Sequence, residues 1–240
     1  LDLMGNPLDG DGDGTGGDPS TVAYTIGAPA NNSHDLQDFI DNAVDGDVIV
    51  LRPATHTGNQ PIRLKGKAIT ITSINPDDPN VVAGTILKNS YDGPIILFEA
   101  DETPLTILQG VTIDSNNRQP HENNIGILID GASPTIRSCV IRGSQFSGVR
   151  IFDGSPLFDR CAFKNNQADY GGGIAIYGGA PVIVNSLFTG NIANQTGSAI
   201  YISGAGRPEI VNNTLADNDA LGSMLPASAL FFSGADPLVA

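Results

Sequence analysis

The chain has 240 residues, with 26 acidic and only 12 basic side chains, and a formal net charge of −14. Nucleic-acid binding depends on Lys and Arg that neutralise phosphates, so this balance argues against nucleic acid, and equally against anionic membrane surfaces, as partners. No apolar run approaches the roughly 18 residues that span a bilayer, so we expect no membrane insertion.

Residues 1–20 form an acidic, glycine-rich tail that is similar to half of an EF-hand calcium loop. Aspartates stand at the first, third and fifth positions of that loop, and a glycine takes the sixth. The twelfth position is Ser20, where a bidentate Glu is expected, so a flexible, solvated linker is the alternative. The candidate calcium ligands are Asp9, Asp11, Asp13, Thr15 and Asp18.

Residues 21–32 are a strand-like lead-in, and residues 33–46 are predicted to form an amphipathic helix. Ser33 suits the N-cap, and Gly46 is expected to end the helix. The apolar stripe of the helix comprises Leu36, Phe39, Ile40 and Val44. We expect this helix to cover the first layer of the repeats that follow.

A dipeptide ending in proline returns every 22 to 30 residues. A period of this length is typical of a solenoid, in which each unit buries its apolar face only by stacking on its neighbours. The dipeptides are Thr103-Pro104, Ser133-Pro134, Ser155-Pro156, Ala180-Pro181, Arg207-Pro208 and Asp236-Pro237.

Alternate positions after each proline are apolar, as in a strand with one buried face. The second position reads Ile136, Phe158, Ile183 and Ile210, and the seventh reads Ile141, Phe163, Phe188 and Leu215. In the unit that begins at Pro104, the inward residues are predicted to be Ile107, Val111 and Ile113. The alternation breaks at Ser138, Arg160, Asn185 and Asn212, which predicts a sharp bend of the kind that left-handed backbone angles allow.

A second signature follows each polar loop and closes on glycine. Its inward pairs are Ile127/Ile129, Val149/Ile151, Ile174/Ile176, Ile200/Ile202 and Leu230/Phe232. One unit therefore contains three short strands and three turns, which is one coil of a parallel β-helix, and the coils are predicted to fill residues 47–240.

This repeat resembles that of the right-handed parallel β-helix superfamily, the pectate-lyase-like fold, over roughly residues 33–240. The resemblance implies an all-β, right-handed parallel β-helix solenoid with an N-terminal amphipathic capping helix. Members of this superfamily include polysaccharide lyases, hydrolases and epimerases, and also adhesins, passenger domains and surface proteins without known catalysis. Because one fold carries many functions, the resemblance does not choose among them.

The two cysteines, Cys139 and Cys161, fall in one column on adjacent coils. Their backbones are expected to lie about 5 Å apart. Buried, stacked free thiols are the favoured interpretation, and a disulfide bridge is the alternative.

The resemblance also implies where a substrate groove would run, along one outer sheet. A lyase there would need a Lys or Arg base and carboxylates that bind calcium. Arg150, with Asp130 and Asp153, is the nearest match, and an ordinary surface arginine is the alternative. Asp217 and Asp219 could face one site as a pair of acids, or be solvated loop residues.

Three aromatic residues, Tyr177, Tyr201 and Phe231, stand on successive coils near the same outer face. They are the candidate substrate-binding residues, because an aromatic strip can stack on sugar rings. A loop that partly covers the strip is the alternative explanation of the same pattern.

The coil that begins at Asp236-Pro237 is incomplete in this sequence, so we expect either a longer protein or another molecule over the last coil. The segment 21–26 of a second copy is one candidate, and such a head-to-tail contact would build a filament.

From these features we expect a non-catalytic, extracellular or cell-surface structural protein, namely a scaffold, adhesin or self-assembling filament subunit. Calcium is its candidate cofactor, and copies of itself or glycans are its candidate partners. The alternative is a calcium-assisted polysaccharide lyase or a glycan-binding module that acts on acidic polysaccharide.

Overall fold

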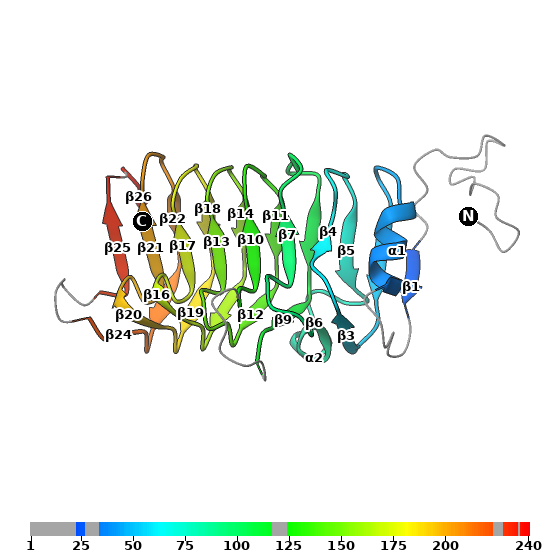
Figure 1. The fold of residues 1–240 in the computed structure, drawn as a ribbon, viewed down its shortest axis with the longest axis horizontal. Helices are drawn as coiled ribbons and strands as arrows, with labels where there is room; N and C mark the ends of the chain where they lie inside the picture. Colours follow the sequence, from blue (N-terminus) through cyan, green and yellow to red (C-terminus); the bar gives the residue numbers. More distant parts are fainter. Residues whose placement is uncertain (1–22, 27–33, 117–123, 223–227, 235) are drawn as a thin grey trace, which may run out of the picture.

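The computed structural model describes residues 23–26, 34–116, 124–222, 228–234 and 236–240. In these residues the chain winds into a solenoid whose coils stack along one axis, from α1 at one end to β25 and β26 at the other (Figure 1). The strands of successive coils pair in parallel and make three long sheets and one small one. The expected all-β, right-handed parallel β-helix with an N-terminal capping helix is confirmed.

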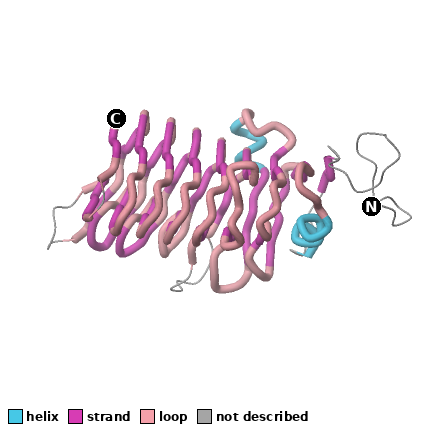
Figure 2. Tube along the Cα trace, turned by 90° about the horizontal axis from the view of Figure 1, so that it is seen from above, coloured by secondary structure: helices cyan, strands magenta, loops and turns pink. Residues whose placement is uncertain are grey.

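The strands of each sheet follow one another along the solenoid axis, and the turns between sheets repeat from coil to coil (Figure 2). Sheet A contains β1 (Ala23–Ile26), β2 (Val48–Leu51), β5 (Thr70–Ser73), β8 (Ile107–Gln109), β11 (Thr135–Arg137), β14 (Leu157–Asp159), β18 (Val182–Val184), β22 (Glu209–Val211) and β26 (Leu238–Val239). Sheet B contains β3 (Ala54–Gly58), β6 (Thr85–Asn89), β9 (Thr112–Asp114), β12 (Val140–Arg142), β15 (Ala162–Lys164), β19 (Leu187–Thr189) and β23 (Thr214–Ala216). Sheet C contains β4 (Ile62–Arg63), β7 (Ile96–Phe98), β10 (Ile127–Ile129), β13 (Val149–Ile151), β17 (Ile174–Ile176), β21 (Ile200–Ser203) and β25 (Leu230–Ser233). Sheet D contains β16 (Gln167–Tyr170), β20 (Ile192–Thr196) and β24 (Asp219–Ala220).

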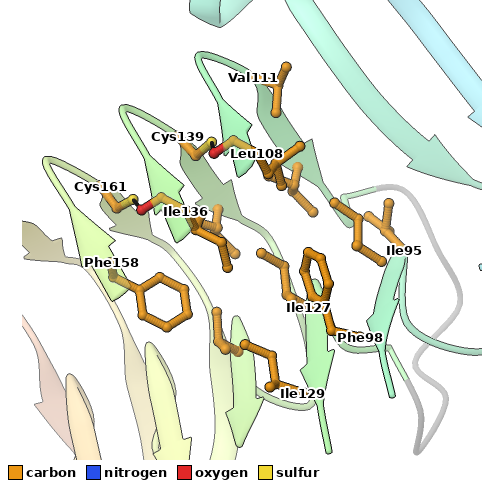
Figure 3. Packing of buried hydrophobic residues seen from close by; sticks show 14 of the residues in the cluster. Ile95, Phe98, Leu108, Val111, Ile127, Ile129, Ile136, Cys139, Phe158 and Cys161 are labelled. Atoms are coloured by element: carbon orange, nitrogen blue, oxygen red, sulfur yellow. Dashed lines mark hydrogen bonds between the residues drawn. The ribbon is translucent and has the colours of Figure 1, made fainter. Parts of the chain in front are cut away.

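The core consists of columns of apolar side chains, one from each coil (Figure 3). The inward residues predicted from the prolines lie in the core, with Ile136, Phe158 and Ile183 fully enclosed and Leu215 partly buried. The prediction for the unit at Pro104 is wrong in one place. Leu108, not Ile107, pairs with Ile136 and is buried, because the loop after Pro104 is longer than in later coils.

The predicted bend between sheets A and B is confirmed. Ser138, Arg160, Asn185 and Asn212 have φ values of 51°, 53°, 53° and 55°, in the left-handed region. This conformation turns the chain sharply enough to start the next strand two residues later. In the unit at Pro104 the same position is Gly110, with a φ of 65°.

A second bend, which the sequence analysis missed, follows sheet B and is supported by a ladder of buried asparagines. Asn191 donates from Nδ2 to the carbonyl of Phe163 at 2.9 Å and to Asn218 Oδ1 at 2.8 Å. Its own Oδ1 accepts from the backbone N–H and from Nδ2 of Asn166, both at 3.1 Å. Each asparagine therefore satisfies backbone groups that the turn leaves without a strand partner.

The helix α1 (His34–Asn42) covers the first coil. Its Leu36 and Ile40 are buried against the core. Val44 was expected in the same apolar stripe but is exposed, because the helix ends at Asn42 and Val44 is out of helical phase. Lys67 Nζ donates to the carbonyls of Ile40, Asp41 and Ala43 at 2.7, 2.8 and 2.8 Å, which stabilises the C-terminal end of the helix.

The strand β1 lies beside this helix and pairs in parallel with β2 of the same chain. It falls within the segment that was expected to resemble a strand, and it is the outermost strand of sheet A.

A second, shorter helix, α2 (Pro79–Gly84), projects from the solenoid beside sheet B (Figure 2). Asp78 is its N-cap and accepts from the Asn80 N–H at 2.8 Å, while Pro79 occupies the first helical position. Thr112 Oγ1 donates to the carbonyl of Val82 at 2.8 Å and ties the helix to β9. Among the described residues, no helix has the length and apolar character needed to span a membrane.

Candidate functional site

The outer face of sheet C is the place where the sequence analysis put a substrate groove. The register of its strands places Arg150 and two of the candidate aromatic residues in one outward column. Arg150 pairs with Leu128 on one side and with Ala175 on the other, and Tyr201 and Phe231 continue the column. The structure therefore brings the candidate base and the candidate aromatic residues to one surface.

Arg150 packs against the ring of Phe146. Its guanidinium carbon lies 3.7 Å from the ring centroid of Phe146, which is a cation–π contact. Its Nε is buried and has no hydrogen-bond partner among the described residues. Burial lowers the pKa of Arg150, and the charges of Tyr177 and Asp169 oppose that shift.

The carboxylates that were expected beside Arg150 are placed differently. Asp169 is the acidic residue whose charge acts on Arg150, and it comes from the loop strand β16. Asp153 instead accepts from the Gly154 N–H at 2.7 Å, and Asp130 lies exposed at the end of β10. Arg150 therefore forms no ion pair with Asp130 or Asp153 within the described residues, and the expected grouping of these three side chains is not formed.

The aromatic residues form a ladder along the solenoid axis. Tyr201 and Phe231 have ring centroids 5.5 Å apart and an interplanar angle of 4°, and Phe152 and Tyr177 are 5.4 Å apart at 20°. Tyr177 and Tyr201 connect the two pairs at 6.1 Å. Because stacked rings cover one another's faces, little open ring face remains for a sugar to stack on.

A loop covers part of this ladder. Tyr170, at the end of β16, lies 4.9 Å from the ring centroid of Tyr201. Gly171 lets the chain turn directly over β17: its φ is 64°, and a Cβ there would stand 2.7 Å from the Cα of Ala175. Ala175 is completely buried although it points to the outer face of the sheet. The geometry agrees with the alternative in which a loop covers the aromatic strip.

The two aspartates considered as an acid pair have separate places in the fold. Asp217 occupies the second bend with a φ of 54°, where earlier coils have Gly143, Asn165 and Gly190 with the same sign of φ. Asp219 lies in β24 and pairs with Ile192. Asp217 thus serves the geometry of the turn.

The cysteines are both buried and free. Each thiol donates to a carbonyl of the preceding coil, Cys139 to Leu108 at 3.7 Å and Cys161 to Ile136 at 3.4 Å (Figure 3). Burial raises the pKa of Cys139 to about 12, despite backbone hydrogen bonds that oppose the shift. Burial likewise raises the pKa of Cys161. The favoured interpretation of stacked free thiols is therefore confirmed.

The proposed calcium ligands, Asp9, Asp11, Asp13, Thr15 and Asp18, lie outside the described residues. Within the part of the chain that the structure describes, no three His, Cys, Asp or Glu side chains are grouped as metal ligands. The calcium hypothesis therefore rests on the sequence of the tail alone.

A cluster of cations on sheet B was missed by the sequence analysis. Arg142 and Lys164 are outward neighbours on β12 and β15. The signal is present in the proline alignment, because both stand eight residues after a proline, Pro134 and Pro156 respectively. The apolar pattern gave no sign of a site at this eighth position, because it follows the last inward apolar residue of the unit and lies at the end of a strand.

The chain matches one family model, described as a right handed beta helix region, over residues 94–231. The match covers more than half of the chain and runs from the coil that contains β7 to the one that contains β25. No curated protein and no solved structure matches the chain. The match and the stacked parallel coils agree, and the chain belongs to the right-handed β-helix family.

Proposed function

We propose that this chain is a non-catalytic structural module of an extracellular or cell-surface protein, in which the β-helix serves as a scaffold. The observation that carries the proposal is the packing on the outer face of sheet C. Arg150 packs on Phe146, and Tyr201 of the aromatic ladder packs against Phe231 and against Tyr170 of β16, so these contacts stabilise the stack of coils. The acidic composition and the low content of Lys support a location outside the cell.

A calcium-assisted polysaccharide lyase is the second candidate, and one observation favours it. Burial lowers the pKa of Arg150, which is the direction that a catalytic base requires. In a lyase, Arg150 would remove the proton on the uronate carbon next to the carboxylate, the glycosidic C–O bond would break with its oxygen as the leaving group, and an unsaturated sugar would result.

An activity assay separates the two candidates. Acidic polysaccharides are incubated with the wild-type protein and with Arg150→Lys, with and without calcium, and the unsaturated product is followed by its ultraviolet absorbance. The scaffold proposal predicts a signal equal to the blank in every case. Product formation by the wild type that Arg150→Lys abolishes would establish the lyase and overturn the scaffold.

For the acidic tail we propose calcium binding, as in the sequence analysis. Alternating carboxylates can surround one hard cation. Titration with calcium should give a binding signal that disappears in the double variant Asp11→Ala, Asp13→Ala. If the wild type and this variant show the same negligible binding, the tail is a linker and the calcium hypothesis is wrong.

For partners we propose a second copy of the chain, stacked end to end. Phe232 and Val239 of the last described coil are 53% and 50% exposed, whereas their counterparts in the preceding coil, Ile202 and Ile210, are buried. At the other end, β1 is the outermost strand of sheet A. A contact between these two unlike ends does not close on itself, so it would extend into a filament.

The stacking proposal is tested by light scattering over a range of protein concentrations. The apparent mass should rise with concentration, and Phe232→Glu should suppress that rise by placing a charge in the contact. A single monomeric mass at every concentration, with and without calcium, contradicts the proposal.

Glycans are the remaining proposed partner, through Tyr177, Tyr201 and Phe231. The 45% exposure of Phe152 at the start of the ladder leaves some aromatic surface for a sugar. Because the other rings are stacked on one another, they offer a sugar less surface than Phe152 does. Retarded migration of the protein through gels that contain polysaccharides would distinguish glycan binding from the scaffold.

A further inference from the structure

A groove of about 470 Å³ lies on sheet B, on a different sheet from Arg150 and the aromatic ladder. One wall is α2 with the turn before it, and the other is the outer face of β9, β12 and β15. The groove is lined by Pro76, Asp77, Pro79, Val82, Ala83, Thr112, Ser138, Cys139, Val140, Arg142, Arg160, Ala162 and Lys164.

Arg142 and Lys164 of the groove belong to a charged column that crosses four neighbouring strands, whereas Arg160, also in the groove, pairs with Asp77 and Asp159. Lys88, Asp114, Arg142 and Lys164 occupy the same outward position on β6, β9, β12 and β15. Asp114 Oδ2 lies 2.8 Å from Arg142 Nη2 and 3.6 Å from Lys88 Nζ. One carboxylate therefore faces two cations, and the third cation, Lys164, has no ion-pair partner among the described residues.

Two positive charges thus stand next to each other on β12 and β15. Like charges directly opposite on paired strands are destabilising. This arrangement occurs in a chain whose net charge is −14, so it is not a consequence of a generally basic surface. A negative group bound between Arg142 and Lys164 would remove the repulsion.

Protein groups use only part of the hydrogen-bonding capacity of the Arg142 guanidinium. Nε of Arg142 is buried and has no hydrogen-bond partner within the described part of the chain, although Nη2 is paired with Asp114. The Arg142 side chain as a whole is 36% exposed, so an oxyanion in the groove can accept hydrogen bonds from the accessible part of the guanidinium.

Besides the polar side chains of Asp77, Ser138 and Arg160, the groove has apolar residues on both walls. Val82 of α2 faces it from one wall, and Val140 and Ala162 face it from the sheet. Thr112 Oγ1 already donates its hydrogen bond to the carbonyl of Val82, so this hydroxyl does not need a polar group of the ligand as an acceptor. A ligand that fits must therefore combine one anionic group with a compact apolar body.

We propose that this groove binds a small organic carboxylate, whose oxygens lie between Arg142 and Lys164 and whose apolar body lies on Val82, Val140 and Ala162. The site is independent of the scaffold function proposed for sheet C. It adds a small-molecule site that neither the repeat nor the family match assigns.

The test uses benzoate as the probe, because it carries one carboxylate on an apolar ring. Benzamide has the same shape without the charge, and inorganic phosphate has charge without the apolar body. Binding to the 240-residue chain is followed by chemical-shift changes of backbone amides in a heteronuclear NMR titration. Benzoate should shift the amides of β12, β15 and α2, and benzamide should shift them only at much higher concentration.

Two variants locate the site. Lys164→Gln removes the unpaired cation and should weaken benzoate binding about five- to tenfold. Ala162→Phe fills the apolar part of the groove and should abolish it. Arg207→Gln is the matched control, because Arg207 is an exposed cation whose Nη2 pairs with Asp236 at 3.4 Å in the last coil, outside the groove. This control should bind benzoate as the wild type does.

Several outcomes would overturn the proposal. Equal affinity for benzoate and benzamide would show that the cations play no part. Equal weakening by Lys164→Gln and Arg207→Gln would show a general charge effect. Phosphate binding as tight as that of benzoate, unaffected by Ala162→Phe, would show that the apolar body is not recognised. The same spectra verify that each variant is folded, since dispersed amide signals require the stacked coils.

Discussion

Asp114 illustrates how single charged residues are used on the surface of this solenoid. Its side chain is 5% exposed and lies between Arg142 and Lys88. Burial opposes its ionisation, but hydrogen bonds from Arg142 and from the Asn116 N–H, with the charges of Arg142 and Lys88, outweigh burial and lower the pKa of Asp114. The carboxylate is therefore stabilised in its charged form in the folded state.

Asp114→Asn should reduce the free energy of unfolding by about 1–3 kcal/mol at pH 7, because the bonds to charged partners are lost. A carboxyl group whose folded pKa is lowered stabilises the protein above its unfolded pKa of about 3.9, and this contribution disappears as the pH falls through the lower folded value. Urea unfolding of both proteins from pH 7 down to pH 3 should show the difference shrinking in acid.

The control for this prediction is Asp77→Asn. Asp77 pairs with Arg160 at 3.5 Å, but its side chain is 75% exposed, so the change in stability should be near zero. A difference between Asp114→Asn and the wild type that stays constant down to pH 3 would contradict the assignment.

The two thiols provide a second prediction at the residue scale. A thiol reacts as its thiolate, and burial raises the pKa of Cys139 to about 12. Neither cysteine should react with Ellman's reagent in the native protein at pH 8, and both should react at once in denaturant. Fast reaction of one or two thiols in the native protein would show that this column of the core is open to solvent.

At the scale of the structural element, the bends hold each coil in register with the next. The first bend was predictable, because its left-handed residues interrupt the apolar alternation at Ser138, Arg160, Asn185 and Asn212. The second bend was not recognised, although Asn166, Asn191 and Asn218 stand ten residues after their prolines. An asparagine in a polar loop is expected to be exposed. Its burial can be predicted only when the backbone groups to which it hydrogen-bonds are known.

Asn191→Ala should lower the free energy of unfolding by about 3 kcal/mol, because it leaves several buried donors and acceptors unpaired. Asn191 is completely buried and bonds to both neighbouring asparagines. Asn218→Ala is the matched control: Asn218 is the last member of the ladder and only partly buried, so its loss should be smaller. Denaturant unfolding gives both values, and equal losses would show that the ladder does not act as a connected network.

The helix α2 shows what the repeat could not reveal. It has six residues, too few for an apolar periodicity, and it is inserted in one coil only. Asp78-Pro79 is a signal for a helix start, but the groove beside α2 depends on the path of the chain back to β6. An alignment of the repeats predicts only what the repeats share, so it cannot predict a helix that is inserted in one of them.

At the scale of the whole molecule, the coils form one continuous stack, and the sequence predicts most of it. The proline register predicts which residues point inward, and Ile136, Phe158 and Ile183 follow it. It also places Arg150 in its outer column. It does not predict the contact of Arg150 with Phe146, because Phe146 lies in a loop whose path has no fixed period.

The central claim is that the outer face of sheet C stabilises the stack and does not bind a substrate. Tyr201→Ala tests it most directly, because Tyr201 lies against Tyr170, Tyr177 and Phe231. Removing this ring should lower the free energy of unfolding by about 2 kcal/mol. Phe152→Ala, at the exposed start of the ladder, is the control and should cost less.

The decisive measurement combines denaturant unfolding of Tyr201→Ala with its migration through gels that contain acidic or neutral polysaccharides. The scaffold account predicts a clear loss of stability and the same unretarded migration for wild type and variant. A wild type that is retarded by a polysaccharide, with a variant that is equally stable but no longer retarded, would contradict it.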